Sequence, residues 1–478
     1  MNKEKLEISI PSFLAAKKRN KEGIETINYK IEDKYINLGL GKTYAIFTYG
    51  CQGNVLDSEN MAGILEEAGY RLAEDKYNAD VVILNTCAIR ENAEDRIWGV
   101  LGQLKGKKQQ NPNMVIAISG CMPQEEGATK KLEESYKFVD IILGTHNRHN
   151  LLKLIYNVYE KKMRVVEVLS GQGNIVENVP IVRNFKHKAF VNIMFGCDEF
   201  CTYCIVPYTR GSERSRCKEQ IINEVTKLAK DGCVEVTLLG QNVNAYGKDL
   251  DGDYTFGDLL NDLSKTGIKR IRYTTSHPRD LDLKTMEAMA NNKEVMPHLH
   301  LPVQSGDDQI LKLMNRKYTH QMYMEKINKL KELIPDISIT TDIIVGFPNE
   351  TEEQFQHTLD LFKEADFEGA FTFIYSPREH TPAASWPDAT PMEEKKDRLN
   401  RLIEVSNQGY LKGTQKFVGK VVKVLVDGAS KDEGLLSGYS EHNKLTHFKS
   451  TDLSLIGKIV NVKITQAQTW FMIGELCE

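Results

Sequence analysis

The chain has 478 residues, a length for which we expect two to four domains and a large hydrophobic core. Its formal net charge is −4, so any contact with nucleic acid must use local basic surfaces rather than the overall charge. No run of about 18 apolar residues is present, and the short apolar stretch near the N-terminus is interrupted by Ser9, Pro11 and Ser12, which makes a signal peptide a poor interpretation. We therefore expect a cytoplasmic protein without a membrane partner, whose nine cysteines serve metal binding or catalysis rather than disulfides.

The first third of the chain predicts an α/β domain with a parallel sheet. Residues 1–42 are polar and aperiodic, which is typical of a flexible N-terminal extension. From 43 to 160, apolar β-rich runs alternate with helical stretches such as Asp57–Ala68 and Ala93–Leu104, and this rhythm indicates parallel strands covered by helices. The expected strands are Tyr44–Tyr49, Val81–Leu84, Val115–Ile118 and Val139–Leu143.

A linker containing glycine and proline, residues 161–186, separates this domain from a second alternating region, 187–410. Six strand–helix units without a clear seventh and eighth predict a partial (β/α)6 barrel. Its expected strands are Ala189–Met194, Val234–Leu239, Arg270–Tyr273, His298–Leu301, Ile339–Val345 and Ala370–Tyr375. Short strands close together in residues 411–478 predict a small C-terminal β-barrel.

Three cysteines directly after the first predicted barrel strand have a C-x3-C-x2-C spacing: Cys197, Cys201 and Cys204. Structural zinc sites need four ligands, whereas three thiolates on one loop suit three irons of a [4Fe–4S] cluster and leave the fourth iron open. The carboxyl end of a barrel strand is also where such barrels place their chemistry. This favours a catalytic cluster over the alternatives, a zinc knuckle or a chance grouping.

A second group of three cysteines is spread over the first domain. Cys51, Cys87 and Cys121 each lie just beyond the carboxyl end of a predicted strand, and these ends meet at the edge where open α/β sheets bind ligands. Three converging thiolates again suit a [4Fe–4S] cluster with one open iron. The alternative is three buried core cysteines, which are common.

The residues around both groups resemble a known family. An aromatic residue, Tyr203, stands just before the last cysteine of the loop, as in the radical-SAM superfamily. Residues 48–60 (TYGCQGNVLDSEN), 84–96 (LNTCAIRENAEDR), 118–126 (ISGCMPQEE) and 200–216 (FCTYCIVPYTRGSERSR) are similar to the methylthiotransferases of that superfamily, and the match extends from about residue 43 onward. The C-terminal segment resembles their TRAM domain, a small RNA-binding barrel. Gly53 departs from the family's C-Q-M-N pattern, where methionine is expected.

The resemblance implies a reaction, its cofactors and its partners. The expected cofactors are two [4Fe–4S] clusters and S-adenosyl-L-methionine. The expected reaction transfers a methylthio group to C2 of N6-isopentenyladenosine beside the anticodon of tRNA, with an electron donor such as flavodoxin or ferredoxin and a sulfur donor as further partners. Alternatives are sister enzymes that modify threonylcarbamoyl-adenosine or a ribosomal-protein aspartate, and a non-catalytic iron–sulfur RNA-binding sensor.

Other residues have weaker assignments. By resemblance, Tyr203, Gln241, Asn242, Gln304 and Gly346 are candidates for binding S-adenosylmethionine, whereas no catalytic side chain is identified. A group of cationic residues after the cysteine loop predicts either a phosphate-binding surface or an ordinary solvated loop: Arg210, Arg214, Arg216 and Lys218. His298 and His300 alternate on one strand and favour polar packing over a metal pair. Aromatic side chains of the C-terminal segment could stack bases or fill the barrel core: Tyr439, Phe448, Trp470 and Phe471.

Overall fold

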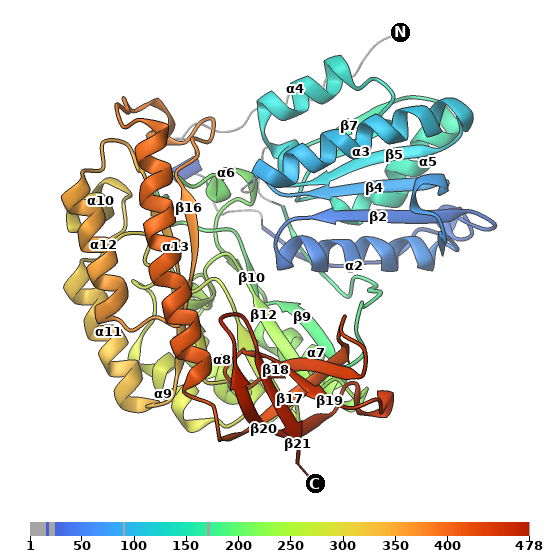
Figure 1. Cartoon of the computed structure of the whole chain (residues 1–478). Coiled ribbons are helices and arrows are strands. Elements are labelled where there is room, and N and C mark those ends of the chain that lie inside the picture. The colour runs from blue at the N-terminus through green and yellow to red at the C-terminus, as the bar shows by residue number, and fades with distance from the viewer. Residues whose placement is uncertain (1–15, 19–23, 89–90, 170–172, 478) are drawn as a thin grey trace.

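The structure is a computed structural model that describes residues 16–18, 24–88, 91–169 and 173–477. Figure 1 shows three parts: an N-terminal α/β domain, a central barrel, and a small C-terminal barrel at the end of the central barrel that lies away from α6 (Val206–Thr209). The fold class expected from the sequence is confirmed. Short 3₁₀ turns connect the elements at Asp33–Tyr35, Lys76–Asn78, Met122–Gln124, Arg148–Asn150, Val243–Ala245, Pro382–Ser385 and Leu453–Leu455.

The N-terminal domain is a six-stranded parallel sheet in the order β3-β2-β4-β5-β6-β7. Helices α2 and α5 cover one face of the sheet, and α3 and α4 cover the other. Successive residues of the central strands point to opposite faces, and the residues on each face are apolar, so both faces need a covering layer of helices. The strands are β2 (Thr43–Tyr49), β3 (Arg71–Leu72), β4 (Val81–Thr86), β5 (Val115–Gly120), β6 (Ile141–Leu143) and β7 (Val165–Glu167). The helices are α2 (Gln52–Glu67), α3 (Glu91–Gln110), α4 (Glu126–Ser135) and α5 (Leu151–Lys161).

Regular structure also occurs in two segments for which the sequence predicts none. Strand β1 (Thr26–Asn28), in the expected N-terminal extension, pairs in parallel with β8 (Ile175–Glu177), in the expected linker. Strand β7, at the start of that linker, completes the sheet by pairing with β6. Residues 1–15 and 19–23 of the extension lie outside the described residues.

The central barrel contains the six expected parallel strands. They form two three-stranded sheets, β13-β12-β9 and β14-β15-β16, which are joined by a bridge between Ile271 and Val295. The strands are β9 (Lys188–Asn192), β12 (Glu235–Leu239), β13 (Arg270–Tyr273), β14 (His298–His300), β15 (Ser338–Val345) and β16 (Ala370–Ile374). A two-stranded antiparallel pair, β10 (Met194–Phe195) and β11 (Arg214–Ser215), lies at the end of β9.

Helices surround these strands on the outside: α7 (Lys218–Lys230), α8 (Phe256–Leu263), α9 (Leu283–Asn291), α10 (Asp308–Leu313), α11 (His320–Leu333), α12 (Glu352–Glu364) and α13 (Met392–Gln415). Three of them begin at a threonine whose hydroxyl accepts a hydrogen bond from a backbone N–H of the first turn, which satisfies a donor that has no partner within the helix: Thr255, Thr319 and Thr351. Helix α13 continues past residue 410, the expected end of the barrel region.

The C-terminal segment is a closed five-stranded barrel in the order β17-β18-β19-β21-β20. Its strands are β17 (Val421–Ala429), β18 (Leu435–Ser440), β19 (Leu445–Lys449), β20 (Ile459–Ala467) and β21 (Met472–Leu476). It is docked on the amino ends of the central strands. Arg270 donates to the carbonyl oxygens of Tyr439 (3.0 Å) and Lys423 (2.8 Å), and Lys188 of β9 pairs with Asp427 at 2.6 Å.

Candidate metal centres

The first cysteine group lies along one edge of the N-terminal sheet. Cys51 is the residue before α2, directly after the β2–Gly50 connection, and Cys87 and Cys121 immediately follow β4 and β5. Cys87 and Cys121 are buried, whereas Cys51 is partly exposed. Since the carboxyl ends of adjacent parallel strands meet at one edge, the sheet topology brings the three side chains to the same place.

Small and amide side chains allow these cysteines to approach one another. A Cβ on Gly50 would lie 3.0 Å from the Cβ of Cys87, and Gly120 has φ +103°, with a Cβ there lying only 2.2 Å from a backbone oxygen. Asn54 accepts from the Cys51 backbone N–H (3.3 Å) and donates to Asn85 Oδ1 (3.1 Å), which ties the first turn of α2 to the end of β4. The sequence analysis missed this amide pair.

The second cysteine group lies on the loop between β10 and α6. Gly196 has φ +78°, and a Cβ there would be 2.0 Å from a backbone oxygen, so the turn before Cys197 requires glycine. The Cys197 N–H donates to the Gly211 carbonyl (3.1 Å), and the Asn315 side chain donates to the carbonyls of Glu199 (3.2 Å) and Phe200 (2.9 Å). Cys197 and Cys201 are buried and Cys204 is partly buried. The loop is therefore held by the barrel on both sides.

The thiols of both groups fit a bound cation. Burial, and then the nearby Cys201 and Cys204, raise the pKa of Cys197 well above its ordinary value, and burial followed by Cys201 raises the pKa of Cys204 to about 12. Burial also raises the pKa of Cys121, although Arg210 opposes this effect. A metal centre bound here would oppose this effect of burial and stabilise the thiolate forms of Cys121, Cys197 and Cys204.

The two groups face each other across the boundary between the domains. Cys121 and Ala88 form one buried cluster with Phe200, Ile205 and Tyr208, which belong to the cysteine loop and α6. The hydroxyl of Thr145, in the N-terminal domain, also donates to the Thr209 carbonyl at 2.7 Å. A ligand reaching both groups is therefore compatible with the fold.

The arginines that follow the loop do not form an exposed basic surface. Arg210, Arg214 and Arg216 are all buried. Arg216 pairs with Glu177 at 2.5 Å and with Glu224 at 2.9 Å. Lys218, which pairs with Glu219 at 4.0 Å, is half-buried. Because these three arginines are buried, they form neither the phosphate-binding surface nor the solvated loop that the sequence offered as alternatives.

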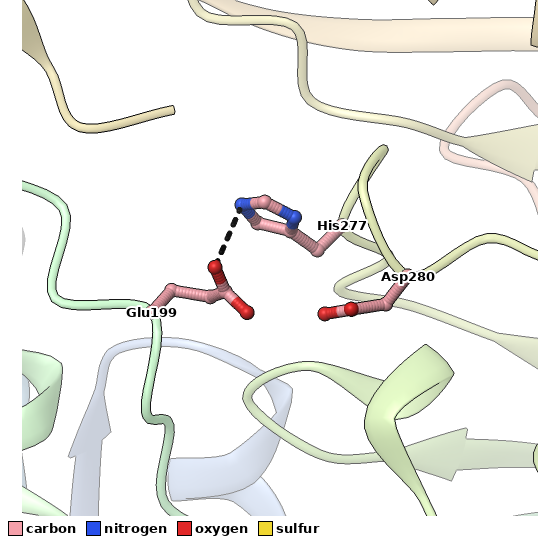
Figure 2. Close-up of side chains that lie close together, drawn as sticks. All are labelled: Glu199, His277 and Asp280. Carbon is pink, nitrogen blue, oxygen red and sulfur yellow. Dashed lines mark ion pairs between the residues drawn. The ribbon is translucent and has the colours of Figure 1, made fainter. Parts of the chain in front are cut away.

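Beside the loop lies a buried polar cluster of Glu199, His277 and Asp280, whose side chains point toward one another (Figure 2). His277 Nε2 is 3.8 Å from Glu199 Oε2, and potential ligand atoms of all three side chains lie within 4.8 Å of one another. Burial, and then Asp280, raise the pKa of Glu199 to about 7. Arg279 already pairs with Glu199, and Lys248 with Asp280. Two cations thus balance the two carboxylates, and we interpret the cluster as a salt-bridge network that fixes the loop.

Comparison with known proteins identifies the family. Residues 191–362 match the radical SAM superfamily, residues 43–144 match Uncharacterized protein family UPF0004, and residues 415–477 match the TRAM domain. The chain is 53% identical over 469 residues to tRNA-2-methylthio-N(6)-dimethylallyladenosine synthase of Geobacillus kaustophilus, covering 98% of this chain and 88% of the relative. The Bacillus subtilis enzyme of the same name is also 53% identical, with coverages of 98% and 92%.

The chain belongs to the tRNA-2-methylthio-N(6)-dimethylallyladenosine synthase family. Its fold is similar to that of the radical S-adenosylmethionine methyltransferase TsrM from Kitasatospora setae, with a TM-score of 0.51, 12% identity and coverage of 76% of each chain. Within the part of the chain that the structure describes, no helix has the length and apolar character needed to cross a bilayer.

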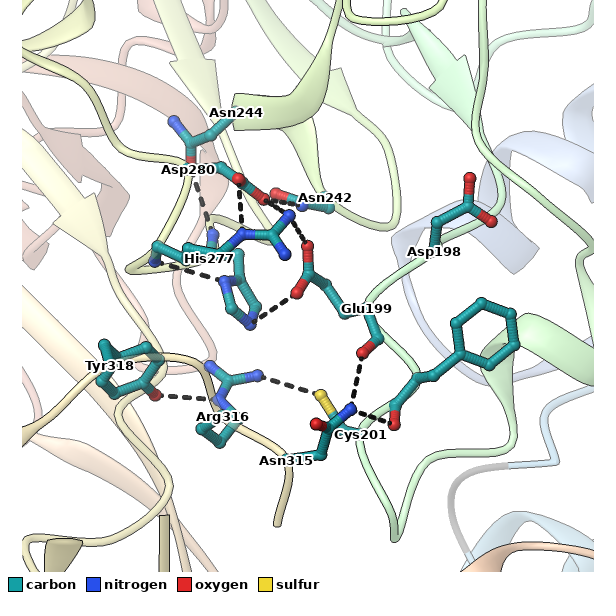
Figure 3. Close-up of polar contacts among 12 residues, drawn as sticks. Asp198, Glu199, Cys201, Asn242, Asn244, His277, Asp280, Asn315, Arg316 and Tyr318 are labelled. Carbon is teal, nitrogen blue, oxygen red and sulfur yellow. Dashed lines mark hydrogen bonds and ion pairs between the residues drawn. The ribbon is translucent and has the colours of Figure 1, made fainter. Parts of the chain in front are cut away.

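In this family member, the side chains expected to bind S-adenosylmethionine lie at different strand ends of the central barrel. Gln241 accepts from the Gly196 N–H, which places it against the cysteine loop. Asn242 donates to Asp280 (2.6 Å), as Figure 3 shows, while its side-chain oxygen is buried without a hydrogen-bond partner among the described residues. The buried side-chain oxygen of Gln304 likewise lacks a partner there. Two buried acceptors are therefore available for a ligand's N–H or O–H groups.

Tyr203 and Gly346 lie in more crowded surroundings. Tyr203 packs against an apolar cluster that includes Met314 and Phe347. Gly346 has φ +65°, its N–H donates to Glu350 at 2.7 Å, and a Cβ there would be 2.6 Å from the side chain of Lys395. The turn alone therefore accounts for this glycine.

Two histidines and Phe448 agree with the packing interpretations, whereas Trp470 does not. Thr340 lies within hydrogen-bond distance of both His298 and His300, which accounts for the two histidines as polar packing. Phe448 fills the core of the C-terminal barrel, whereas the Trp470 side chain is exposed and packs against Tyr410. The nine cysteines, all among the described residues, form no disulfide.

Proposed function

We propose that this enzyme transfers a methylthio group to C2 of N6-dimethylallyladenosine in tRNA, the isopentenylated adenosine beside the anticodon. The observation that carries the proposal is the identity of 53% along 98% of the chain to enzymes named for this product. Two cysteine groups that adjoin within one fold support it, because the reaction needs both a radical source and a sulfur carrier. Acid–base side chains could not activate the non-acidic C2–H of adenine at neutral pH.

Each cysteine group holds one cluster. Cys51, Cys87 and Cys121 are the ligands in the N-terminal domain, and Cys197, Cys201 and Cys204 are the ligands in the barrel. When bound there, two [4Fe–4S] clusters with S-adenosylmethionine supply the radical that removes the C2 hydrogen and the methylthio group that replaces it. The chain's own contribution is to hold both sites at one boundary and to keep water away by burying the loop between them.

Five residues form the S-adenosylmethionine site in this proposal, by direct contact or by fixing a neighbouring segment: Tyr203, Gln241, Asn242, Gln304 and Gly346. The assignment of Asn242 and Gln304 has the strongest support, because their side-chain oxygens lack partners and the amino group and ribose hydroxyls of S-adenosylmethionine are donors. Gln241 acts through the loop that it fixes, and Tyr203 forms an apolar wall. The contribution of Gly346 is its backbone, because the position has no room for a side chain.

We propose that the parts of the chain divide the work along the predicted boundaries: 1–42 as an extension, 43–160 as the methylthiotransferase domain, 161–186 as a linker, 187–410 as the radical-SAM barrel and 411–478 as the TRAM-like RNA-binding domain. Strand β7 within 161–186 belongs to the N-terminal sheet, and α13 extends the barrel part past residue 410. We further propose that the enzyme acts in the cytoplasm, where flavodoxin or ferredoxin supplies electrons and a separate donor replaces the sulfur.

The substrate can be tested by complementation. A strain that lacks its own synthase receives the gene, and its tRNA nucleosides are measured by mass spectrometry. Return of the 2-methylthio-dimethylallyl nucleoside supports the proposal, and Cys201→Ala should not restore it. Return of a methylthiolated threonylcarbamoyl nucleoside, or of modified ribosomal protein, would instead assign one of the sister activities.

A second experiment distinguishes a radical-SAM enzyme from a non-catalytic RNA-binding sensor. Anaerobically reconstituted protein is given S-adenosylmethionine and a reductant, and 5′-deoxyadenosine is quantified. A radical enzyme makes this product, whereas an iron–sulfur RNA-binding sensor makes none.

A further inference from the structure

A buried group of charges lies beside the N-terminal cysteines. Asp57 Oδ2 accepts a hydrogen bond from Arg210 Nη2 at 3.1 Å and forms an ion pair with Arg148 Nη1 at 2.7 Å, and the Asp57 side chain is only 1% exposed. Among the side chains that the structure describes, Asp57 is the only carboxylate within ion-pair distance of either arginine. Two guanidinium groups therefore share one carboxylate, and the group carries a net positive charge in a place where water cannot compensate it.

The sulfur atoms of the cysteine group supply the missing negative charge. Arg210 Nε donates to Cys121 Sγ at 3.3 Å. A Cβ on Gly53 would lie 3.5 Å from Cys51 Sγ and 3.9 Å from Arg210 Nη2, so the guanidinium also lies close to the second sulfur. Since Arg210 belongs to the barrel part of the chain, the cation comes from across the domain boundary.

The backbone next to Arg210 contacts the other cysteine group. Arg210 ends the short helix α6 through its N–H to the Val206 carbonyl at 2.8 Å, and the next carbonyl, that of Gly211, accepts from the Cys197 N–H at 3.1 Å. Two consecutive residues thus hold one cysteine of each group. A substitution at position 210 should therefore alter the surroundings of both cysteine groups.

We propose that Arg210 is a positioning residue that acts as the charged partner of the N-terminal cluster and makes that cluster easier to reduce. This inference rests on the proposed function, because it takes Cys51, Cys87 and Cys121 as cluster ligands. Reduction by one electron makes the cluster and its ligand sulfurs more negative. A buried cation within hydrogen-bond distance of a ligand sulfur stabilises that reduced state more than the oxidised one.

The test isolates the N-terminal cluster in the full-length chain. Alanine replaces the three cysteines of the barrel loop, and the protein is reconstituted anaerobically, its iron is counted, and its reduction potential is measured by titration with EPR detection of the reduced cluster. Arg210→Gln, which removes the positive charge, should shift the potential to a more negative value. Asp57→Asn, which removes the shared negative charge, should shift it to a less negative value.

Two further variants separate charge from folding. Arg210→Lys keeps the charge but not the forked geometry, and its potential should lie between those of the parent and Arg210→Gln. Arg216→Gln removes a buried arginine of the same segment whose charge is balanced by its own two carboxylates, so the potential should not move. A purely structural role for Arg210 would give no opposite shifts for Arg210→Gln and Asp57→Asn.

The outcomes distinguish this inference from the proposed function. A parent protein that binds no iron overturns the assignment of the cysteines themselves. A parent with about four irons and equal potentials in Arg210→Gln and Asp57→Asn overturns only the role of Arg210. Should Arg210→Gln fail to hold iron, Asp57→Asn decides, and an unchanged potential there overturns the inference.

Discussion

Arg270 holds the C-terminal barrel on the central barrel, and its replacement by methionine should release the smaller barrel. Arg270 is 1% exposed, and its two hydrogen bonds to the carbonyls of Tyr439 and Lys423 join the two parts. Burial, and then the neighbouring Arg272, lower the pKa of Arg270 to about 10, so its guanidinium is charged at neutral pH. Hydrogen bonds from a charged donor contribute about 1.5–3 kcal/mol each. Loss of both, which removes the partners of two backbone carbonyls, should cost about 3–5 kcal/mol of docking free energy.

Native-state proteolysis measures this cost. Cleavage between α13 and β17 that proceeds through the undocked state follows the population of that state when undocking is fast, so along this route Arg270→Met should be cut roughly 100-fold faster or more. The matched control is Arg401→Met, because Arg401 makes ion pairs with Glu352 and Asp397 on the exposed surface of α13. Such pairs contribute less than about 1 kcal/mol. Equal cleavage rates for Arg270→Met and the parent would refute the reasoning.

Three further predictions concern single positions. Gly196→Ala places a Cβ 2.0 Å from a backbone oxygen at φ +78°, which should displace the cysteine loop. Iron and sulfide assays should then show a fall from about eight to about four irons per chain. In the control Gly102→Ala, the added Cβ has no atom within 4 Å, and both clusters should be kept. The Cβ added by Gly53→Ala makes only ordinary van der Waals contacts in the first turn of α2. A urea titration should therefore show that the unfolding free energy of the metal-free protein rises by about 0.4–1 kcal/mol. A decrease in the unfolding free energy would contradict the space seen around Gly53. Burial raises the pKa of Glu368, but Lys444 and Lys416 outweigh this effect and hold it below 4.5. Docking of the C-terminal barrel should therefore weaken as pH falls below about 4.5, and Glu368→Gln should reduce that pH dependence of cleavage; the part that persists belongs to Asp427, whose pKa His187 and Lys188 also lower.

The strands could be predicted from the sequence because a parallel sheet buries both faces. Its strands then appear as short apolar runs between polar segments, and Arg270–Tyr273 was predicted with the bounds that the structure has. The position of the cysteines followed from the same pattern, since each comes just after such a run. Helix starts were less visible: α2 begins at Gln52 rather than at Asp57, because Cys51 and Asn54 form its first turn together.

Contacts between distant segments could not be predicted. Arg210 and Asp57 are 153 positions apart, and nothing in the sequence around Arg210 distinguishes a buried ion pair from a phosphate-binding loop. Likewise β1 and β8 are each three residues long and become strands only because they pair with each other. Strand position, spacing and the family resemblance predicted the two cysteine groups, while the charges that surround them required the three-dimensional structure.

The docking of the C-terminal barrel constrains how an RNA reaches the cysteines. On β9, Lys188 at the amino end pairs with Asp427 of the small barrel, and Cys197 lies beyond the carboxyl end. The four steps of about 3.3 Å from Lys188 to Asn192 separate the two ends of β9 by roughly 13 Å. A base positioned at the cysteine groups therefore cannot also touch the C-terminal barrel. If that barrel binds the same tRNA, it must contact a part of the molecule at least this far from the modified adenosine, so it contributes affinity and orientation while the choice of base is made at the domain boundary.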